Sequence, residues 1–184
     1  MALLIIFLGL FFTVGLAIYY LHDVPAISKI ESDVLPESSI IYDRNGGELY
    51  NLYNEEKRTY APYDQISSHM RDAIISAEDK TFFENPGIDM KGLVRAGFNY
   101  IIGKTDKVQG TSTISQQLIK NVFFTSERST DRKAKEIYLS YELNNKYSKE
   151  KILELYLNKI SFGNNAYGVE EASKTYFNKS VKDL

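Results

Sequence analysis

The sequence predicts a mainly α-helical domain that carries a short N-terminal β-hairpin and follows one transmembrane helix. Three observations predict this: an apolar run over residues 2–21, two tyrosine-rich runs around Asn45-Gly46, and helical spacing of apolar residues from Gln65 onward. The 184 residues, 43% of them hydrophobic, suffice for one domain with a buried core. The absence of Cys excludes a disulfide framework, and a net charge of −2 argues against a nucleic-acid partner.

Residues 2–21 contain no charged side chain, and Thr13, Tyr19 and Tyr20 are the only polar residues among them. As a helix, a run of this length spans roughly 30 Å, the thickness of a bilayer core. A buried core helix would show a polar stripe, which this run lacks. A cleaved signal peptide is the main alternative, but the run has no basic start and no clear cleavage site. We therefore predict a transmembrane helix over residues 1–21.

The elements that follow are predicted from local patterns. Pro25 and Pro36 suit a juxtamembrane connector over residues 22–37, and the two β-prone runs of residues 39–54 suit a hairpin. Apolar spacing predicts a helix whose buried face holds Met70, Ala73, Ile74 and Ala77 and which leads into Glu78-Asp79.

More helices are predicted downstream. Thr113 and Gln116 have the spacing of a capping box, so we expect a helix to begin there. In the helix after it, Ala134, Ile137, Tyr138 and Tyr141 are expected to form the inner face. The predicted helices cover residues 92–102, 113–121, 130–147, 148–162 and 167–178.

The polar residues within these helices are informative only together. Glu78, Asp79 and Glu136 would each, taken alone, be interpreted as solvated surface carboxylates. Between Lys120 and Lys151, however, there are eight basic and five acidic residues. This stretch therefore carries a charge of +3 in a chain whose net charge is −2. A positive field beside a helix N-terminus favours a phosphate or diphosphate, although a solvated helical face explains the charge equally well. Two carboxylates flanking a cationic pocket suit glycosyl transfer.

Five sequence blocks carry a resemblance to a known family. The chain resembles the peptidoglycan glycosyltransferase domain, glycosyltransferase family 51, of class A penicillin-binding proteins and monofunctional wall transglycosylases. The blocks are Glu78-Asp79 to Phe82 with Gly87 and Asp89, Gly110 to Asn121, Arg132 to Glu136, Lys151 to Asn158 with Phe162-Gly163, and Ala172 with Tyr176-Phe177.

The resemblance implies a lysozyme-like, two-lobed fold with a smaller, membrane-facing lobe. It also implies polymerisation of lipid II into β-1,4 glycan strands, with inversion at the anomeric carbon and release of undecaprenyl diphosphate. The expected location is the cytoplasmic (inner) membrane, with a single membrane pass and the catalytic domain on the outer face. Lipid II, the growing glycan chain, the membrane and a cell-wall synthesis complex are the implied partners.

The resemblance assigns catalytic roles to two residues. Glu78 is expected to be the general base on the acceptor hydroxyl, and Glu136 to organise the donor side. Asp79 is expected to support Glu78. The roles expected for Arg132 and Asn158 are structural, and Tyr156 and Phe162 are interpreted as packing residues. The expected substrate-binding set is Asp79, Ser112, Thr113, Gln117, Lys120, Arg128, Arg132 and Lys135. No cofactor is required by the sequence, and Mg²⁺ or Mn²⁺ at the diphosphate is a further expectation.

Two departures from the family pattern stand out. Asn85 occupies the place where the family usually carries His, which affects the expected geometry of that loop. The chain also ends at Leu184 and contains no Ser-x-x-Lys to Lys-Thr-Gly set. We therefore expect a domain over residues 38–184 that is C-terminally truncated and lacks a transpeptidase domain.

The sequence is compatible with two alternatives to a polymerase. A lysozyme-like peptidoglycan hydrolase or lytic transglycosylase would share the fold and the first glutamate. It would have little use for the membrane anchor or for the cationic set of Lys120, Arg128 and Lys135, which the resemblance places at the donor diphosphate. A non-catalytic scaffold of cell-wall synthesis is the second alternative. The presence of Asn85 in place of His and the early end of the chain are both compatible with it.

Overall fold

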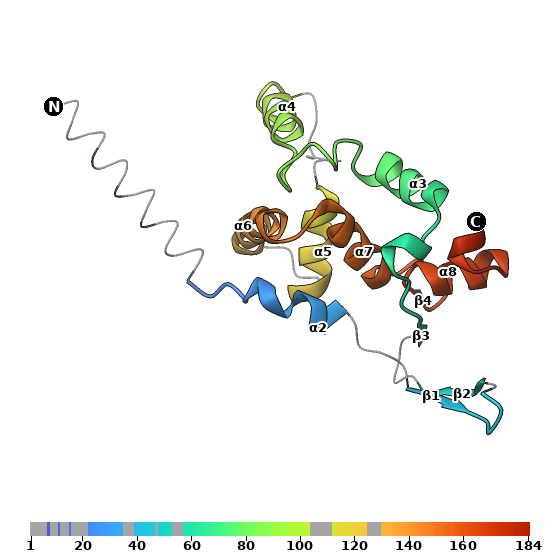
Figure 1. Ribbon diagram of the computed structural model, residues 1–184. Helices are drawn as coiled ribbons and strands as arrows, with labels where there is room; N and C mark the ends of the chain where they lie inside the picture. Colours follow the sequence, from blue (N-terminus) through green and yellow to red (C-terminus); the bar gives the residue numbers. More distant parts are fainter. Residues whose placement is uncertain are drawn as a thin grey trace.

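The computed structural model describes the chain from residue 22 onward, with gaps. The described ranges are 22–34, 39–46, 48–52, 57–103, 112–124 and 130–184, together with the isolated positions 7, 11 and 15 (Figure 1). Within these ranges, no helix is both long and apolar enough to cross a bilayer. Apart from the three isolated positions, the predicted transmembrane helix lies outside the described residues.

The described part is mainly helical, as predicted. Three short 3₁₀ helices accompany the α-helices, at Ile27–Lys29, Tyr63–Gln65 and Val181–Asp183. The α-helices are α2 (Ile30–Val34), α3 (Ser68–Glu78), α4 (Met90–Ile101), α5 (Ile114–Phe123), α6 (Thr130–Lys146), α7 (Lys149–Lys159) and α8 (Val169–Phe177). The helix that we expected after Thr113 begins there with a complete capping box, in which Thr113 and Gln116 bond each other's backbone.

Two pairs of short strands complete the described fold. Strands β1 (Ser39–Tyr42) and β2 (Glu48–Leu52) pair antiparallel, with an irregularity in register between Ile41 and Tyr42. Strands β3 (Lys57–Arg58) and β4 (Ala166–Tyr167) pair parallel. This second pair was not predicted, and it joins the segment before α3 to the loop between α7 and α8.

The core lies around α5 and α7, which pack against each other near the centre of the molecule (Figure 1). Every residue of α7 from Ile152 to Asn158 is buried. Helix α5 contributes Ile114, Leu118 and Ile119 to the same core, and α6 covers it with Leu139 and Leu143. Ile30 of α2 is also fully buried, so the predicted connector contributes to the core.

The structure contradicts two predicted helix faces. On α6, Tyr138 and Tyr141 are 37% and 49% exposed, and the buried face holds Glu136, Leu139 and Ser140 instead. The prediction was wrong because it counted only apolar residues, whereas α6 also buries a carboxylate. On α3, Met70 and Ile74 are half-buried while Ala73 and Ala77 are exposed. Helix α3 lies at the edge of the core, which leaves its C-terminal end open to solvent.

Buried polar side chains of α7 attach the extended segment before α3. The carboxylate of Glu154 accepts hydrogen bonds from the Tyr60 hydroxyl (2.6 Å), the Tyr63 backbone N–H (2.8 Å) and the Lys151 ammonium (2.6 Å). Burial alone opposes ionisation, but the bonds from Lys151, Tyr60 and Tyr63 outweigh it and hold the pKa of Glu154 below its usual value. Asn158 adds a bond to each backbone polar group of Ala61.

This arrangement makes stability depend on pH. Because the pKa of Glu154 is lower in the folded than in the unfolded chain, its ionised form stabilises the fold above the unfolded carboxyl pKa. That contribution disappears as the pH falls through the folded value. We predict that Glu154→Gln is less stable than the parent at neutral pH and loses less stability on going from about pH 7 to about pH 3.

Urea unfolding followed by circular dichroism across this pH range measures the effect. Glu150→Gln is the matched control, because Glu150 is an exposed residue in the first turn of the same helix. Parallel stability curves for Glu154→Gln and the parent would contradict the prediction.

Candidate functional site

The site is centred on two adjacent carboxylates at the C-terminal end of α3. Glu78 is the last residue of the helix and is exposed, whereas Asp79 is 7% exposed. The backbone leaves helical geometry at Asp79 (φ −157°, ψ 81°), so the two side chains point in different directions. Glu78 is available to a ligand, while Asp79 is turned into the protein.

Asp79 connects the end of α3 to the start of α5. Its Oδ2 accepts a hydrogen bond from the backbone N–H of Ile114, the first residue of α5, at 3.2 Å. Asn85 donates from Nδ2 to both carboxylate oxygens, at 3.0 and 3.1 Å. A carboxylate at a helix N-terminus also interacts favourably with the helix dipole. These bonds fix the backbone from which Glu78 projects.

Asn85 stabilises the loop between α3 and α4. Besides donating to Asp79, its Oδ1 accepts from the Gly87 N–H at 2.9 Å. Gly87 has a φ of +93°, and a Cβ there would lie 2.5 Å from the Ser140 backbone oxygen. Its carbonyl accepts from Thr113 Oγ1 at 2.7 Å, so the loop packs directly against α5 and α6. An asparagine therefore supplies both a donor and an acceptor at this position.

Lys149 covers this loop from α7. Its ammonium donates to the Asn85 carbonyl at 2.6 Å and lies 4.7 Å from the centre of the Phe82 ring. Burial lowers the pKa of Lys149, while the negative charge of Asp79 acts in the opposite direction.

Glu78 lines two clefts at once. The first has a volume of about 540 Å³, and its wall includes Gln117, Tyr156, Lys159 and Tyr167. The second has a volume of about 440 Å³, and its wall includes Lys80, Lys91, Arg95 and Thr113. Each is large enough for a small ligand. One carboxylate thus lies at the junction of two potential ligand sites, and Gln117 Nε2 donates to it at 2.8 Å.

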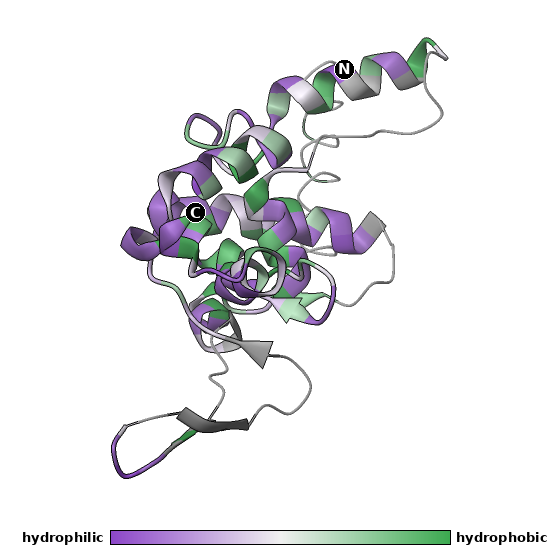
Figure 2. Ribbon diagram, turned by 90° about the vertical axis from the view of Figure 1, so that its right-hand side faces the viewer, coloured by the Kyte–Doolittle hydropathy of each residue, from purple (hydrophilic) through white to green (hydrophobic). Residues whose placement is uncertain are grey.

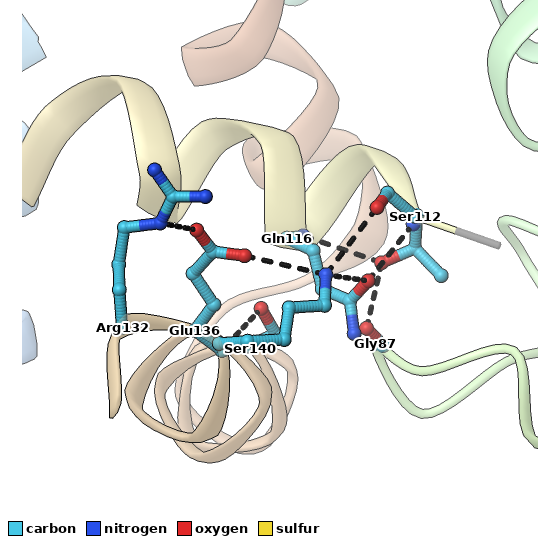
Figure 3. Close-up of polar contacts among 8 residues, drawn as sticks. Gly87, Ser112, Gln116, Arg132, Glu136 and Ser140 are labelled. Carbon is cyan, nitrogen blue, oxygen red and sulfur yellow. Dashed lines mark hydrogen bonds and ion pairs between the residues drawn. The ribbon is translucent and has the colours of Figure 1, made fainter. Parts of the chain in front are cut away.

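A second polar cluster surrounds Glu136 on α6. Figure 3 shows its carboxylate beside Arg132, at 2.8 Å from Arg132 Nε. The ammonium of Lys133 lies 3.2 Å from the other carboxylate oxygen. The Lys133 ammonium also approaches Ser112 Oγ at 3.3 Å and Gln116 Oε1 at 3.4 Å. Glu136 is only 3% exposed, so it is a buried carboxylate that two cations neutralise.

The expected cations differ in their surroundings. Lys135 is largely buried and pairs with Asp131 at 3.3 Å, whereas Lys120 is exposed on α5, one turn beyond Gln117. Arg128 lies outside the described residues. Neither Lys120 nor Lys135 is among the residues that line the two clefts around Glu78.

The structure adds cationic residues that sequence reasoning missed. Lys80, Lys91 and Arg95 line the second cleft with Glu78, and Lys133 bridges Ser112 to Glu136. The sequence held a weak signal for the three residues of the second cleft. Lys80 directly follows the Glu78-Asp79 pair, and Lys91 and Arg95 are four residues apart, which places them on one side of a helix. Within the part of the chain that the structure describes, no group of three or more acidic or histidine side chains is placed to hold a metal ion.

Comparison with known proteins identifies the class to which this fold and site belong. Residues 45–184 match the transglycosylase family, and the chain belongs to that family.

Individual relatives extend the similarity to nearly the whole chain. A penicillin-binding protein 1A from Rickettsia typhi is 40% identical over 185 residues, which cover 98% of this chain and 23% of the relative. A penicillin-binding protein 1F from Bacillus subtilis is 45% identical over 151 residues, which cover 82% of this chain and 21% of the relative. This chain therefore spans less than a quarter of the length of these relatives.

The loop geometry yields a stability prediction. Replacing Asn85 with alanine removes the donor to Asp79 and the acceptor of the Gly87 N–H, and both remaining groups are buried. We expect Asn85→Ala to lower the free energy of unfolding by about 2 kcal/mol. Urea unfolding measures the loss, with Glu84→Ala as the control because Glu84 is exposed in the same loop. Equal stability of the two variants would show that the Asn85 bonds contribute nothing.

Proposed function

We propose that this chain is a peptidoglycan glycosyltransferase that polymerises lipid II into β-1,4 glycan strands. The observation that carries the proposal is the position of Glu78, an exposed carboxylate at the junction of two clefts with basic side chains in their walls. Family membership and the similarity to penicillin-binding proteins support the same function. A transfer reaction needs two ligand sites that meet at one base, and this geometry suits that requirement.

In the proposed mechanism, Glu78 removes the proton from the 4-hydroxyl of the GlcNAc of lipid II. The resulting oxygen attacks the anomeric carbon of the growing chain on the face opposite its diphosphate. A new C–O bond forms as the bond to the diphosphate breaks, and the bonding electrons stay with the leaving oxygen. The anomeric centre is thereby inverted from α to β.

The basic side chains would stabilise the anionic parts of both substrates. Donor and acceptor each carry a lipid-linked diphosphate, and the chain offers two groups of cations. One is the predicted set of Lys120, Arg128 and Lys135, to which we add Lys133 of α6. The other group is Lys80, Lys91 and Arg95 in the second cleft. Negative charge that develops on a leaving oxygen is strongly stabilised by cations held in place beforehand.

Glu136 has a different proposed role from Glu78. Because its carboxylate is buried between Arg132 and Lys133, it orients these cations and does not exchange protons with substrate.

Ser112 and Thr113 lie at the N-terminus of α5, where backbone N–H groups and hydroxyls favour an anionic or sugar ligand.

Helix α4 provides a candidate membrane-facing surface. Val94, Phe98 and Ile101 lie on one side of it and are 68%, 62% and 82% exposed. The helix stands at the top of the molecule, apart from the central helices, in both views (Figures 1 and 2). Lys91 and Arg95 of the same helix line the second cleft. We propose that this apolar side rests on the bilayer, so that the cleft opens near the lipid-linked substrate.

The proposal includes a membrane anchor. Residues 2–21 would hold the protein in the cytoplasmic membrane, with the catalytic domain on its outer face. Confining enzyme and substrate to one plane raises their effective concentration.

The Glu78 proposal predicts a specific loss of activity. Glu78→Gln preserves size and hydrogen bonding but cannot accept a proton, so we expect polymerisation of labelled lipid II to fall at least about 100-fold while lipid II binding persists. Gel analysis of glycan strands measures the product. Glu84→Gln is the control, because Glu84 is an exposed glutamate that does not line either cleft.

Other outcomes of this assay select other functions. Cleavage of finished glycan strands without consumption of lipid II would identify a hydrolase. A parent protein that binds lipid II but makes no polymer would identify a non-catalytic scaffold. Unchanged polymerisation by Glu78→Gln would remove Glu78 from the role of base.

The membrane-facing surface can be tested by fluorescence. The chain contains no Trp, so a single introduced tryptophan is a specific probe. We predict that the tryptophan of Phe98→Trp is quenched by brominated lipids in vesicles containing the full chain, because the side chain enters the bilayer. Phe177→Trp is the control, since Phe177 is 61% exposed on α8, away from α4. Equal quenching of both probes, or of neither, would contradict the proposed orientation.

A further inference from the structure

The hydroxyl of Tyr156 is unexplained by packing. Tyr156 lies on α7 and is 2% exposed, among the residues of the core. We interpreted it from the sequence as a packing residue, but phenylalanine would fill the same volume without a polar atom. Burying a hydroxyl costs free energy unless it has a hydrogen-bond partner. The partner of this hydroxyl therefore indicates what the oxygen contributes.

That partner connects Tyr156 to the proposed base. The phenol donates to Gln117 Oε1 at 3.0 Å, and Gln117 Nε2 donates to Glu78 Oε2 at 2.8 Å. The three side chains come from α7, α5 and α3 and form one continuous hydrogen-bonded chain. All three also line the first cleft.

The chemistry of these groups fixes the direction of the hydrogen bonds. An ionised carboxylate only accepts hydrogen bonds, so the amide NH₂ of Gln117 must face Glu78. The amide oxygen then faces Tyr156, whose hydroxyl must donate. Burial, together with the charge of Glu78, raises the pKa of Tyr156 above its usual value, so the phenol keeps the proton that it donates.

We propose that Tyr156 is a positioning residue that acts through Gln117 to favour the ionised form of Glu78. The NH₂ group bonds more strongly to an ionised than to a protonated carboxyl, so an amide held in this direction favours the ionised form. An amide that was free to turn could instead offer its oxygen to the O–H of a protonated Glu78. The Tyr156 hydroxyl opposes that turn, because its bond to the amide oxygen would be lost. The phenol donor would then face an NH₂ group. The hydroxyl of Tyr156 therefore makes protonation of Glu78 less favourable. This inference rests on the proposed function, because it assigns Glu78 the role of base.

Tyr156→Phe tests the inference through the pH dependence of activity. The variant leaves the amide free to turn, so Glu78 should ionise at a higher pH. The experiment measures the rate of lipid II polymerisation at saturating substrate as a function of pH. We expect the acid limb of this pH–rate profile to move up by about half a pH unit to one pH unit. The rate should return to that of the parent on the alkaline plateau, where Glu78 is ionised in both proteins.

A tyrosine away from the clefts provides the control. Tyr147→Phe is the matched control, because Tyr147 is a half-buried tyrosine that lines neither cleft, and its profile should be unchanged. A loss of rate by the same factor at every pH would show that Tyr156 acts only through packing. An unshifted acid limb would equally overturn the inference.

A second variant tests the same hydrogen bonds, and a second measurement does not depend on activity. Gln117→Leu breaks the same chain of hydrogen bonds, so adding Tyr156→Phe to it should shift the acid limb no further. An additional shift would overturn the inference.

In ¹⁵N-labelled protein, the side-chain amide signal of Gln117 should follow the titration of Glu78, and the midpoint of this signal change should rise in Tyr156→Phe. An unchanged midpoint would refute the inference whatever the activity. A parent protein that makes no glycan would instead refute the proposed function and leave the amide titration as a separate result.

Discussion

The structure of the site depends on the buried hydrogen bonds of Asp79. This carboxylate accepts from the first N–H of α5 and from Asn85, and it thereby joins the end of α3 to the start of α5. The next residue back is Glu78, whose side chain points into two clefts. An exposed carboxylate at the end of an edge helix would ordinarily be poorly fixed, because helix ends fray. The adjacent buried carboxylate removes that freedom.

Helix α5 then connects the two polar clusters of the site. Gln117 bonds to Glu78 on one side, and Gln116 receives the Lys133 ammonium on the other. Successive residues of a helix point in directions that differ by about 100°. Two neighbouring glutamines can therefore serve two different carboxylate clusters from one short helix. The capping box at Thr113 fixes where this helix starts, and so fixes the direction of both glutamine side chains.

The sequence was sufficient for the parts of the fold that local patterns determine. The cap at Thr113 and the helical character of most of the chain were predicted correctly, because capping and apolar spacing involve residues close in sequence. The parallel pairing of β3 with β4 was not predictable, since it joins segments far apart in the chain. The inner face of α6 was predicted wrongly, because apolar spacing cannot reveal that Glu136 is buried with its ion-pair partners. The contact of Tyr156 with Gln117 also depends on how two helices pack, which the spacing within either helix does not specify.

The surroundings of the two glutamates explain why they suit different roles. Protonating Glu136 would leave the charges of Arg132 and Lys133 without their partner in a buried site, so that change of charge is costly. Glu78 is exposed and its bonded neighbour Gln117 is neutral, so it can gain or lose a proton without leaving a buried cation unpaired. A general base must change its charge in every reaction cycle. In the mechanism that we propose, burial and pairing therefore suit Glu136 to hold cations in place, and Glu78 is the carboxylate that carries the proton.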